Sequence, residues 1–151
     1  MRRVVVDSNA IDPLIDIPGA YEAMRSSIEQ GQLEVLYTHV NIDELAVVPD
    51  EDRRARLLLA LAALGNLVPT GARVLDFSRL NWARFGDDRE ALEEFRSGNI
   101  DHTRDALIAA TAQYEQCELV TNERRLTNRA RARGLTVITT EKLLKDLGFT
   151  V

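Results

Sequence analysis

Arg3-Val4-Val5-Val6-Asp7-Ser8-Asn9 is the stretch of this sequence that decides the fold. Three consecutive β-branched residues without polar alternation are typical of a strand that is covered on both faces, as in the centre of a parallel sheet. The apolar run ends at the carboxylate of Asp7. Because ligands bind at the carboxyl ends of strands in open α/β sheets, we expect Asp7 to face a binding crevice. A role in capping the next helix would explain the same residue equally well.

The composition is that of an ordinary globular protein. The chain has 151 residues, of which 45% are hydrophobic and 28% charged, so we expect a single domain over residues 1–151. The longest apolar run, residues 57–64, is far shorter than the roughly 20 residues that a membrane span needs. We therefore expect a soluble, cytoplasmic protein. Cys117 is the only cysteine, which excludes an intrachain disulfide and a thiolate metal cluster; we expect it to be a small buried apolar group.

The net charge is negative, but one segment is strongly basic. Lysine and arginine total 19 against 24 acids, which gives −5 and argues against a general electrostatic attraction for nucleic acid. Residues 122–134 nevertheless carry five arginines and a single acid, Glu123. A solvated helix face is the more common explanation of such a segment. The alternative is a local ridge that binds phosphate groups.

Strand and helix patterns alternate along the chain. After the first strand, further strands are expected at residues 33–37, 74–77, 118–121 and 136–139. Helices with their caps are expected at residues 8–17, 21–30, 38–47, 50–64, 80–85, 91–95, 100–116, 122–134 and 140–148. Such alternation implies right-handed βαβ units. The predicted fold class is therefore α/β, with three layers, α/β/α, around a central parallel sheet of about five strands.

Four of the expected helices begin at a residue that can cap them. Ser8 or Asn9 is expected to cap the helix after the first strand, and Thr38 the helix that contains Glu44. Asp101 and Thr140 are expected to cap the helices at residues 100–116 and 140–148.

Four acids follow the predicted strands closely. Asp7, Glu44, Asp105 and Glu123 each lie just after a strand or in the first turns of a following or adjacent helix. Because the strand ends of a parallel sheet converge, the four carboxylates are expected to share one pocket. Like charges at low dielectric repel by several kcal/mol, so such a cluster needs a proton or a cation. Ligands that are all oxygen favour Mg²⁺ or Mn²⁺.

Taken singly, these acids have simpler explanations. Glu44 could form a buried salt bridge or face solvent, and Asp105 could stabilise the start of its helix through the helix dipole. The case for a shared site therefore depends on all four acids together.

The sequence around each acid resembles a motif of one protein family. Val-Val-Asp-Ser-Asn matches an apolar strand that ends in Asp-Thr/Ser-Asn, and Thr-His-Val-Asn-Ile-Asp-Glu-Leu, from Thr38, matches a second motif with Glu44 as its acid. Arg-Asp-Ala-Leu-Ile-Ala-Ala-Thr-Ala, from Arg104, matches the third. The fourth, Leu-Val-Thr-Asn-Glu-Arg-Arg-Leu from Leu119, has Glu123 where the family mostly has Asp. In order and spacing, the chain resembles PIN-domain ribonucleases, and at this length the VapC-type toxins of toxin–antitoxin pairs.

The resemblance implies metal-assisted hydrolysis of RNA phosphodiester bonds. It implies that Asp7, Glu44 and Asp105 bind Mg²⁺ or Mn²⁺, with Glu123 as a fourth catalytic acid. Because Glu is one methylene longer than Asp, we expect Glu123 to act through a bound water. The implied partners are an RNA substrate, a cognate antitoxin protein and a second copy of the chain in a homodimer.

The resemblance also implies supporting residues. Asn9 and Thr121 correspond to positions that hold the metal ligands by hydrogen bonds. Since an acidic pocket repels RNA, we expect Arg124 and Arg125 to bind RNA phosphates beside it.

Other families fit less well. Haloacid-dehalogenase-type phosphatases need a second Asp two residues after the first, where this chain has Asn9. Response-regulator receivers need an acidic pair near the first strand, and no acidic pair precedes Ser8, although Lys142 would offer their lysine. A PIN-like module that binds RNA or protein with little or no catalysis remains an alternative, supported by Glu123 in place of Asp.

Overall fold

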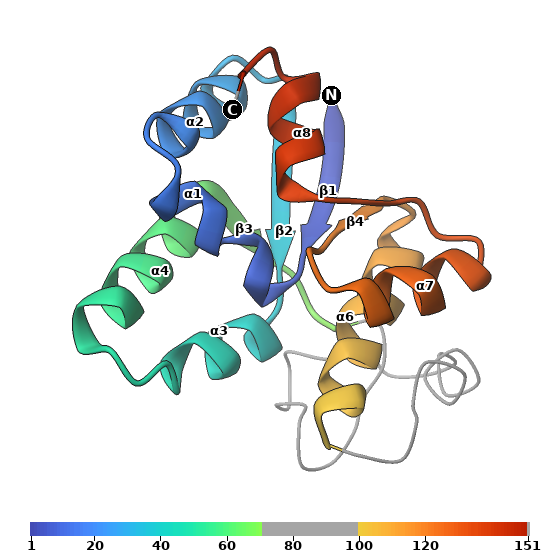
Figure 1. Cartoon of the computed structure of the whole chain (residues 1–151). Coiled ribbons are helices and arrows are strands. Elements are labelled where there is room, and N and C mark those ends of the chain that lie inside the picture. The colour runs from blue at the N-terminus through green and yellow to red at the C-terminus, as the bar shows by residue number, and fades with distance from the viewer. Residues whose placement is uncertain (71–99, 151) are drawn as a thin grey trace.

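The computed structural model describes residues 1–70 and 100–150, which form a parallel sheet between two layers of helices (Figure 1). The five strands lie in the order β3-β2-β1-β4-β5, and every neighbouring pair is parallel. They are β1 (Arg2–Val6), β2 (Leu33–Tyr37), β3 (Gly65–Leu67), β4 (Glu118–Val120) and β5 (Val137–Ile138). The predicted α/β class with a parallel sheet of about five strands is therefore confirmed.

The described helices divide between the two faces of the sheet. They are η1 (Ser8–Ala10, a 3₁₀ turn), α1 (Asp12–Asp16), α2 (Ala20–Glu29), α3 (His39–Ala46), α4 (Glu51–Leu64), α6 (Ile100–Glu115), α7 (Arg124–Ala132) and α8 (Thr140–Asp146). One core contains Val4 and Val6 with buried residues of α1, α2, α4 and α8. The other contains Val5 with buried residues of α6 and α7. Successive β1 side chains thus enter opposite cores, which explains the uninterrupted valine run. No described helix is long and apolar enough to cross a membrane.

The order of the strands places a crevice beside β1. The chain runs outward from β1 through β2 to β3 and then returns to the other side of β1 with β4 and β5. The connections that follow β1 and β4 therefore lead to opposite edges of the sheet. Such a switch point between two neighbouring strands opens a crevice at their carboxyl ends. Asp7 follows β1 there, and Thr121 follows β4.

The edge strand β3 differs from the sequence prediction. The third strand expected at 74–77 and the helices expected at 80–85 and 91–95 lie outside the described residues. Gly65 does end α4, as expected, but it also begins β3. A Cβ atom on Gly65 would lie 2.5 Å from Cδ1 of Tyr37 on β2, so the missing side chain is what lets the two strands approach. A three-residue strand of Gly-Asn-Leu has no apolar pattern from which it could be predicted.

Three of the expected helix caps are wrong: Ser8 or Asn9, Thr140, and Asp101. Asp7, not Ser8 or Asn9, is the N-cap of η1 and accepts a hydrogen bond from the Ser8 N–H, so the alternative capping role considered for Asp7 is confirmed. Thr139, not Thr140, caps α8 by accepting from the Lys142 N–H at 3.1 Å, because β5 ends at Ile138.

Asp101 lies inside α6, which already includes Ile100. The Thr38 cap of α3 is confirmed, and Asn41 completes a capping box with it. Cys117 is half-buried rather than fully buried.

Candidate metal centre

A cavity of about 290 Å³ opens at the carboxyl ends of β1 and β4, and most of its charged lining is acidic. The charged residues of its lining are Asp7, Asp12, Glu44, Arg53, Asp105 and Glu123. All four acids singled out from the sequence therefore reach one cavity. They come from four elements, because Asp7 follows β1, Glu44 lies on α3, Asp105 on α6, and Glu123 precedes α7.

Asp7 is the most enclosed of these acids, with 2% of its surface exposed. Its Oδ1 accepts a hydrogen bond of 2.8 Å from the Ser8 N–H, and its Oδ2 accepts one of 2.7 Å from the Thr121 hydroxyl. Burial raises the pKa of Asp7, the two hydrogen bonds oppose this shift, and the charge of Glu123 adds to it. Because both oxygens are held, the direction of this carboxylate is fixed.

Glu44 is positioned by the way α3 leaves β2. Its Oε1 accepts a hydrogen bond of 3.1 Å from the hydroxyl of Ser8, the residue after Asp7. Asn41, one turn before Glu44, donates from Nδ2 to the Val6 carbonyl at 3.0 Å. The end of β1 and the start of α3 are thereby joined, and Glu44 is carried to the cavity.

Asp105 is the acid on which the site's electrostatics act most strongly. Its pKa is raised from 3.8 to about 8, first by burial, then by the charges of Asp7, Glu123 and Glu44, and finally by a hydrogen bond with Glu123. At neutral pH and without a cation, burial and the neighbouring acids therefore favour the protonated form of Asp105.

Three of the carboxylates form a compact set of oxygen atoms. Asp7, Glu44 and Asp105 each offer one oxygen, and these oxygens all lie within 4.8 Å of one another. A set made only of carboxylate oxygens has the chemistry that Mg²⁺ and Mn²⁺ prefer. The three residues therefore fit a hard divalent cation.

Glu123 lies beside this set rather than within it. It is the N-cap residue of α7, yet its side chain makes no capping hydrogen bond to the helix. The carboxylate instead lines the cavity and contacts Asp105. Its backbone N–H donates to the Thr121 hydroxyl oxygen at 3.1 Å, which fixes the chain as it enters α7.

Known proteins resemble this chain in sequence pattern and in fold. The sequence pattern of the PIN domain matches residues 4–132, which contain all four acids. The chain belongs to the PIN domain family. No curated protein matches it by sequence.

Two crystal structures share the fold of this PIN domain. PAE2754 from Pyrobaculum aerophilum has a TM-score of 0.61 and 22% sequence identity, with 97% of each chain covered. VapBC2 from Rickettsia felis, solved with a DNA fragment from its promoter, has a TM-score of 0.59 and 14% identity, with 91% of this chain and 98% of that chain covered. At these identities the likeness establishes the fold.

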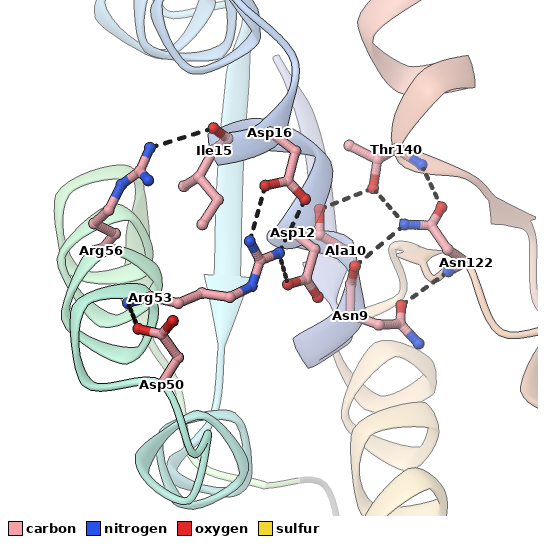
Figure 2. A network of polar contacts seen from close by, with 10 residues as sticks. All are labelled: Asn9, Ala10, Asp12, Ile15, Asp16, Asp50, Arg53, Arg56, Asn122 and Thr140. Carbon is pink, nitrogen blue, oxygen red and sulfur yellow. Dashed lines mark hydrogen bonds and ion pairs between the residues drawn. The ribbon is translucent and has the colours of Figure 1, made fainter.

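Asn9 and Thr121 contribute to the PIN domain's cavity in different ways. Thr121 binds Asp7 directly through its hydroxyl. The Asn9 side-chain oxygen accepts the Asn122 N–H at 3.0 Å, and Asn122 in turn donates from Nδ2 to Thr140 Oγ1 at 3.1 Å (Figure 2). Thr140, which is buried, donates its hydroxyl to the Ala10 carbonyl at 2.9 Å. This network joins η1, the end of β4 and the start of α8 around the cavity.

Arg53 also lines the cavity and has no counterpart in the sequence prediction. Its guanidinium group donates to Asp12 at 2.6 Å and to both oxygens of Asp16 at 2.9 Å (Figure 2). The contacts tie α4 to α1 and neutralise Asp12. No local sequence pattern connects Arg53 with Asp12 and Asp16, so these contacts could not be predicted from the sequence.

Ser8 and Asn41 were also missed as site residues, although each had a signal. Ser8 directly follows the first acid, and Asn41 lies three residues after the Thr38 cap, where a side chain can reach back to the cap. Arg124 and Arg125 are exposed at the start of α7, immediately after Glu123, as the sequence led us to expect.

Proposed function

We propose that this PIN domain is a metal-dependent endoribonuclease that hydrolyses RNA phosphodiester bonds, and that it is the toxin of a type II toxin–antitoxin pair. The observation that carries the proposal is the meeting of Asp7, Glu44 and Asp105 oxygens within 4.8 Å in one cavity. Three elements far apart in the sequence bring like charges together, at a cost that burial increases. A structural role does not require such an arrangement, whereas a cation site does.

In this proposal Asp7, Glu44 and Asp105 bind Mg²⁺ or Mn²⁺. When bound, the ion would lower the pKa of a water molecule and neutralise charge on the phosphate that is attacked. The hydrogen bonds from Ser8 and Thr121 orient Asp7 for the cation and partly oppose the rise that burial gives its pKa. Asp105, whose pKa burial and neighbouring charges raise, would bind the ion in its ionised form and so release its proton.

The remaining residues orient water and RNA. Glu123 lies outside the three-oxygen set, which supports a role in holding a water molecule rather than the ion. Asn9 supports the loop that carries Thr121. Arg124 and Arg125 are exposed beside Glu123, where they would bind the phosphates of RNA that the acidic cavity repels.

The proposed partners are a cognate antitoxin protein and a second copy of the chain. The motif resemblance to VapC-type toxins supports the antitoxin, and the VapBC2 protein of Rickettsia felis shares the fold. We further propose that residues 1–151 form one domain and that the protein acts in the cytoplasm.

The second candidate is a PIN-like module that binds RNA or protein without efficient catalysis. The observation that favours it is Glu123, which stands where the family mostly has Asp and lies outside the three-oxygen set. The two candidates differ in whether divalent metal produces RNA cleavage.

The test is incubation of the full chain with a panel of end-labelled single-stranded RNAs in Mg²⁺, in Mn²⁺ and in EDTA. The enzyme is expected to produce discrete fragments only with metal, and Asp7→Asn is expected to produce none. Asp52→Asn, at an exposed residue of α4 outside the cavity lining, removes the same single negative charge and is the matched control. Metal-independent cleavage, or equal cleavage by Asp7→Asn, would reject the enzymatic proposal.

A further inference from the structure

The side chain of Asn41 links the start of α3 to the candidate metal centre. It is fully buried, with 0% of its surface exposed. Its Oδ1 accepts the Thr38 N–H at 2.8 Å, while its Nδ2 donates to the Val6 carbonyl at 3.0 Å and to the Ser8 hydroxyl oxygen at 3.3 Å. The orientation of the amide follows from these neighbours, because exchanging its oxygen and nitrogen would set donor against donor and acceptor against acceptor.

The contact with Asn41 fixes the direction of the Ser8 hydroxyl. A serine hydroxyl has one hydrogen to donate, and here an N–H of Asn41 already occupies one side of its oxygen. The hydroxyl hydrogen is directed to Oε1 of Glu44, 3.1 Å away. Ser8 also donates its backbone N–H to Asp7. One residue thus holds two of the three carboxylates, and Asn41 holds that residue.

We propose that Asn41 is a positioning residue for the metal centre, acting through the Ser8 hydroxyl to orient the Glu44 carboxylate toward Asp7 and Asp105. This inference rests on the metal-dependent function proposed above. Glu44 has a long side chain with three rotatable torsions, so without a fixed donor it would occupy several rotamers. A donor that orients a ligand carboxylate in advance typically strengthens metal binding by an order of magnitude or more.

A purely structural role for Asn41 predicts different behaviour. Asn41 also completes the capping box of α3, so its loss would lower stability in any case. A structural residue would affect the melting temperature of the metal-free protein without a specific effect on metal affinity, and its effect would not depend on the Ser8 hydroxyl.

Two variants separate these roles. Asn41→Asp keeps an oxygen for the Thr38 N–H and adds negative charge near the centre, but it cannot donate to Ser8. Charge alone would strengthen cation binding, whereas positioning predicts weaker binding, so the two effects have opposite signs. Ser8→Ala removes the hydroxyl without altering the α3 cap, and it remains informative if the Asn41 variant does not fold. Ser8→Thr keeps the hydroxyl and serves as the conservative control.

The measurement is the dissociation constant of Mn²⁺ by isothermal titration calorimetry on the full chain, with a melt of each metal-free variant alongside. We expect Asn41→Asp and Ser8→Ala each to weaken Mn²⁺ binding about 10-fold, and Ser8→Thr to bind like the parent. The double variant should bind no more weakly than either single variant, because both changes break the same chain of hydrogen bonds.

Unchanged or tighter Mn²⁺ binding in Asn41→Asp would overturn the positioning role but not the proposed function. The same holds if the losses of affinity in the two single variants multiply in the double variant. If Asn41→Asp does not fold, unchanged binding in Ser8→Ala overturns it. A parent protein that does not bind Mn²⁺ would overturn the proposed function as well.

Discussion

At the scale of single residues, the acids of the cavity differ in how they are held. Asp7 accepts two hydrogen bonds that partly oppose the rise in its pKa, whereas burial and the charges of its acidic neighbours raise the pKa of Asp105 to about 8. The two acids differ because hydrogen bonds favour the charged form of a carboxylate, whereas like charges nearby disfavour it. The acids of the cluster therefore respond differently to pH and to substitution.

The raised pKa of Asp105 predicts a pH dependence of stability. Its pKa is about 8 in the folded chain against 3.8 for the ordinary side chain. Between these values the folded protein binds more protons than the unfolded one, so the free energy of unfolding falls as pH rises. The metal-free protein should therefore melt at a higher temperature at pH 5 than at pH 8. Thermal melts in EDTA across this range measure the effect.

Two substitutions control this result. Asp105→Asn should reduce the fall in melting temperature, and the raised pKa of Asp7 accounts for a remainder. Asp16→Asn should retain it, because the hydrogen bonds from Arg53 lower the pKa of Asp16 and keep its titration out of this window. A fall of equal size in Asp105→Asn would show that another group is responsible.

Glu123 provides a second prediction at this scale. Since its carboxylate lies outside the set of three oxygens, its loss should resemble the loss of a supporting residue, with activity reduced roughly 10–100-fold. Glu123→Ala should thus retain measurable ribonuclease activity, Asp7→Ala and Asp105→Ala should not, and Glu123→Asp should be at least as active as the parent. Single-turnover cleavage of one RNA compares them. Glu123→Ala as inactive as Asp7→Ala would make Glu123 a direct ligand.

At the scale of elements, α7 combines a buried face with a basic one. Leu126 and Ala130 are buried against the sheet, while Arg124 and Arg125 are exposed at the end nearest the cavity. The apolar contacts fix the helix, and the arginines are then presented to solvent beside the acids. An acidic cavity needs such a surface to approach a polyanion.

Removal of the two arginines should weaken RNA binding in a salt-dependent way. For Arg124→Ala with Arg125→Ala, the slope of log affinity against log salt should flatten by roughly one unit for each phosphate that the helix no longer binds. Binding of RNA to a cleavage-deficient Asp7→Asn background, measured at several salt concentrations, gives the slope. Arg25→Ala on α2 is the control. An unchanged slope would leave α7 as a solvated face or a partner surface.

At the scale of the whole molecule, the candidate metal centre draws its acids from both halves of the sheet. Asp7 follows the central strand, Glu44 comes from the helix after β2, and Asp105 comes from the helix before β4. Unfolding separates all three, so a cation bound by the set stabilises the entire fold.

Divalent metal should therefore raise the melting temperature of the chain. Binding to the folded state alone adds about 2.7 kcal/mol at a concentration roughly 100 times the dissociation constant. Asp7→Asn should reduce this response, and relief of repulsion should leave the metal-free variant at least as stable as the parent. Melts with and without Mg²⁺ or Mn²⁺ test both statements. Identical metal shifts in the two proteins would exclude Asp7 as a ligand.

Features that depend on neighbouring residues could be predicted from the sequence. Strand β1 follows from its uninterrupted run of β-branched residues, β2 from its apolar alternation, and the Thr38 cap from local capping chemistry. The placement of Asp7 at the end of a central parallel strand was predictable for the same reason.

Only the tertiary structure decided which side chains meet. The Ser8 contact with Glu44, the Arg53 contacts with Asp12 and Asp16, and the pairing of β3 through Gly65 join residues far apart in the chain. No local pattern encodes such contacts, because they depend on the order of the strands and on how closely the helices approach. The raised pKa of Asp105 also depends on the tertiary structure, because its burial and its three charged neighbours exist only once the sheet has brought the acids together.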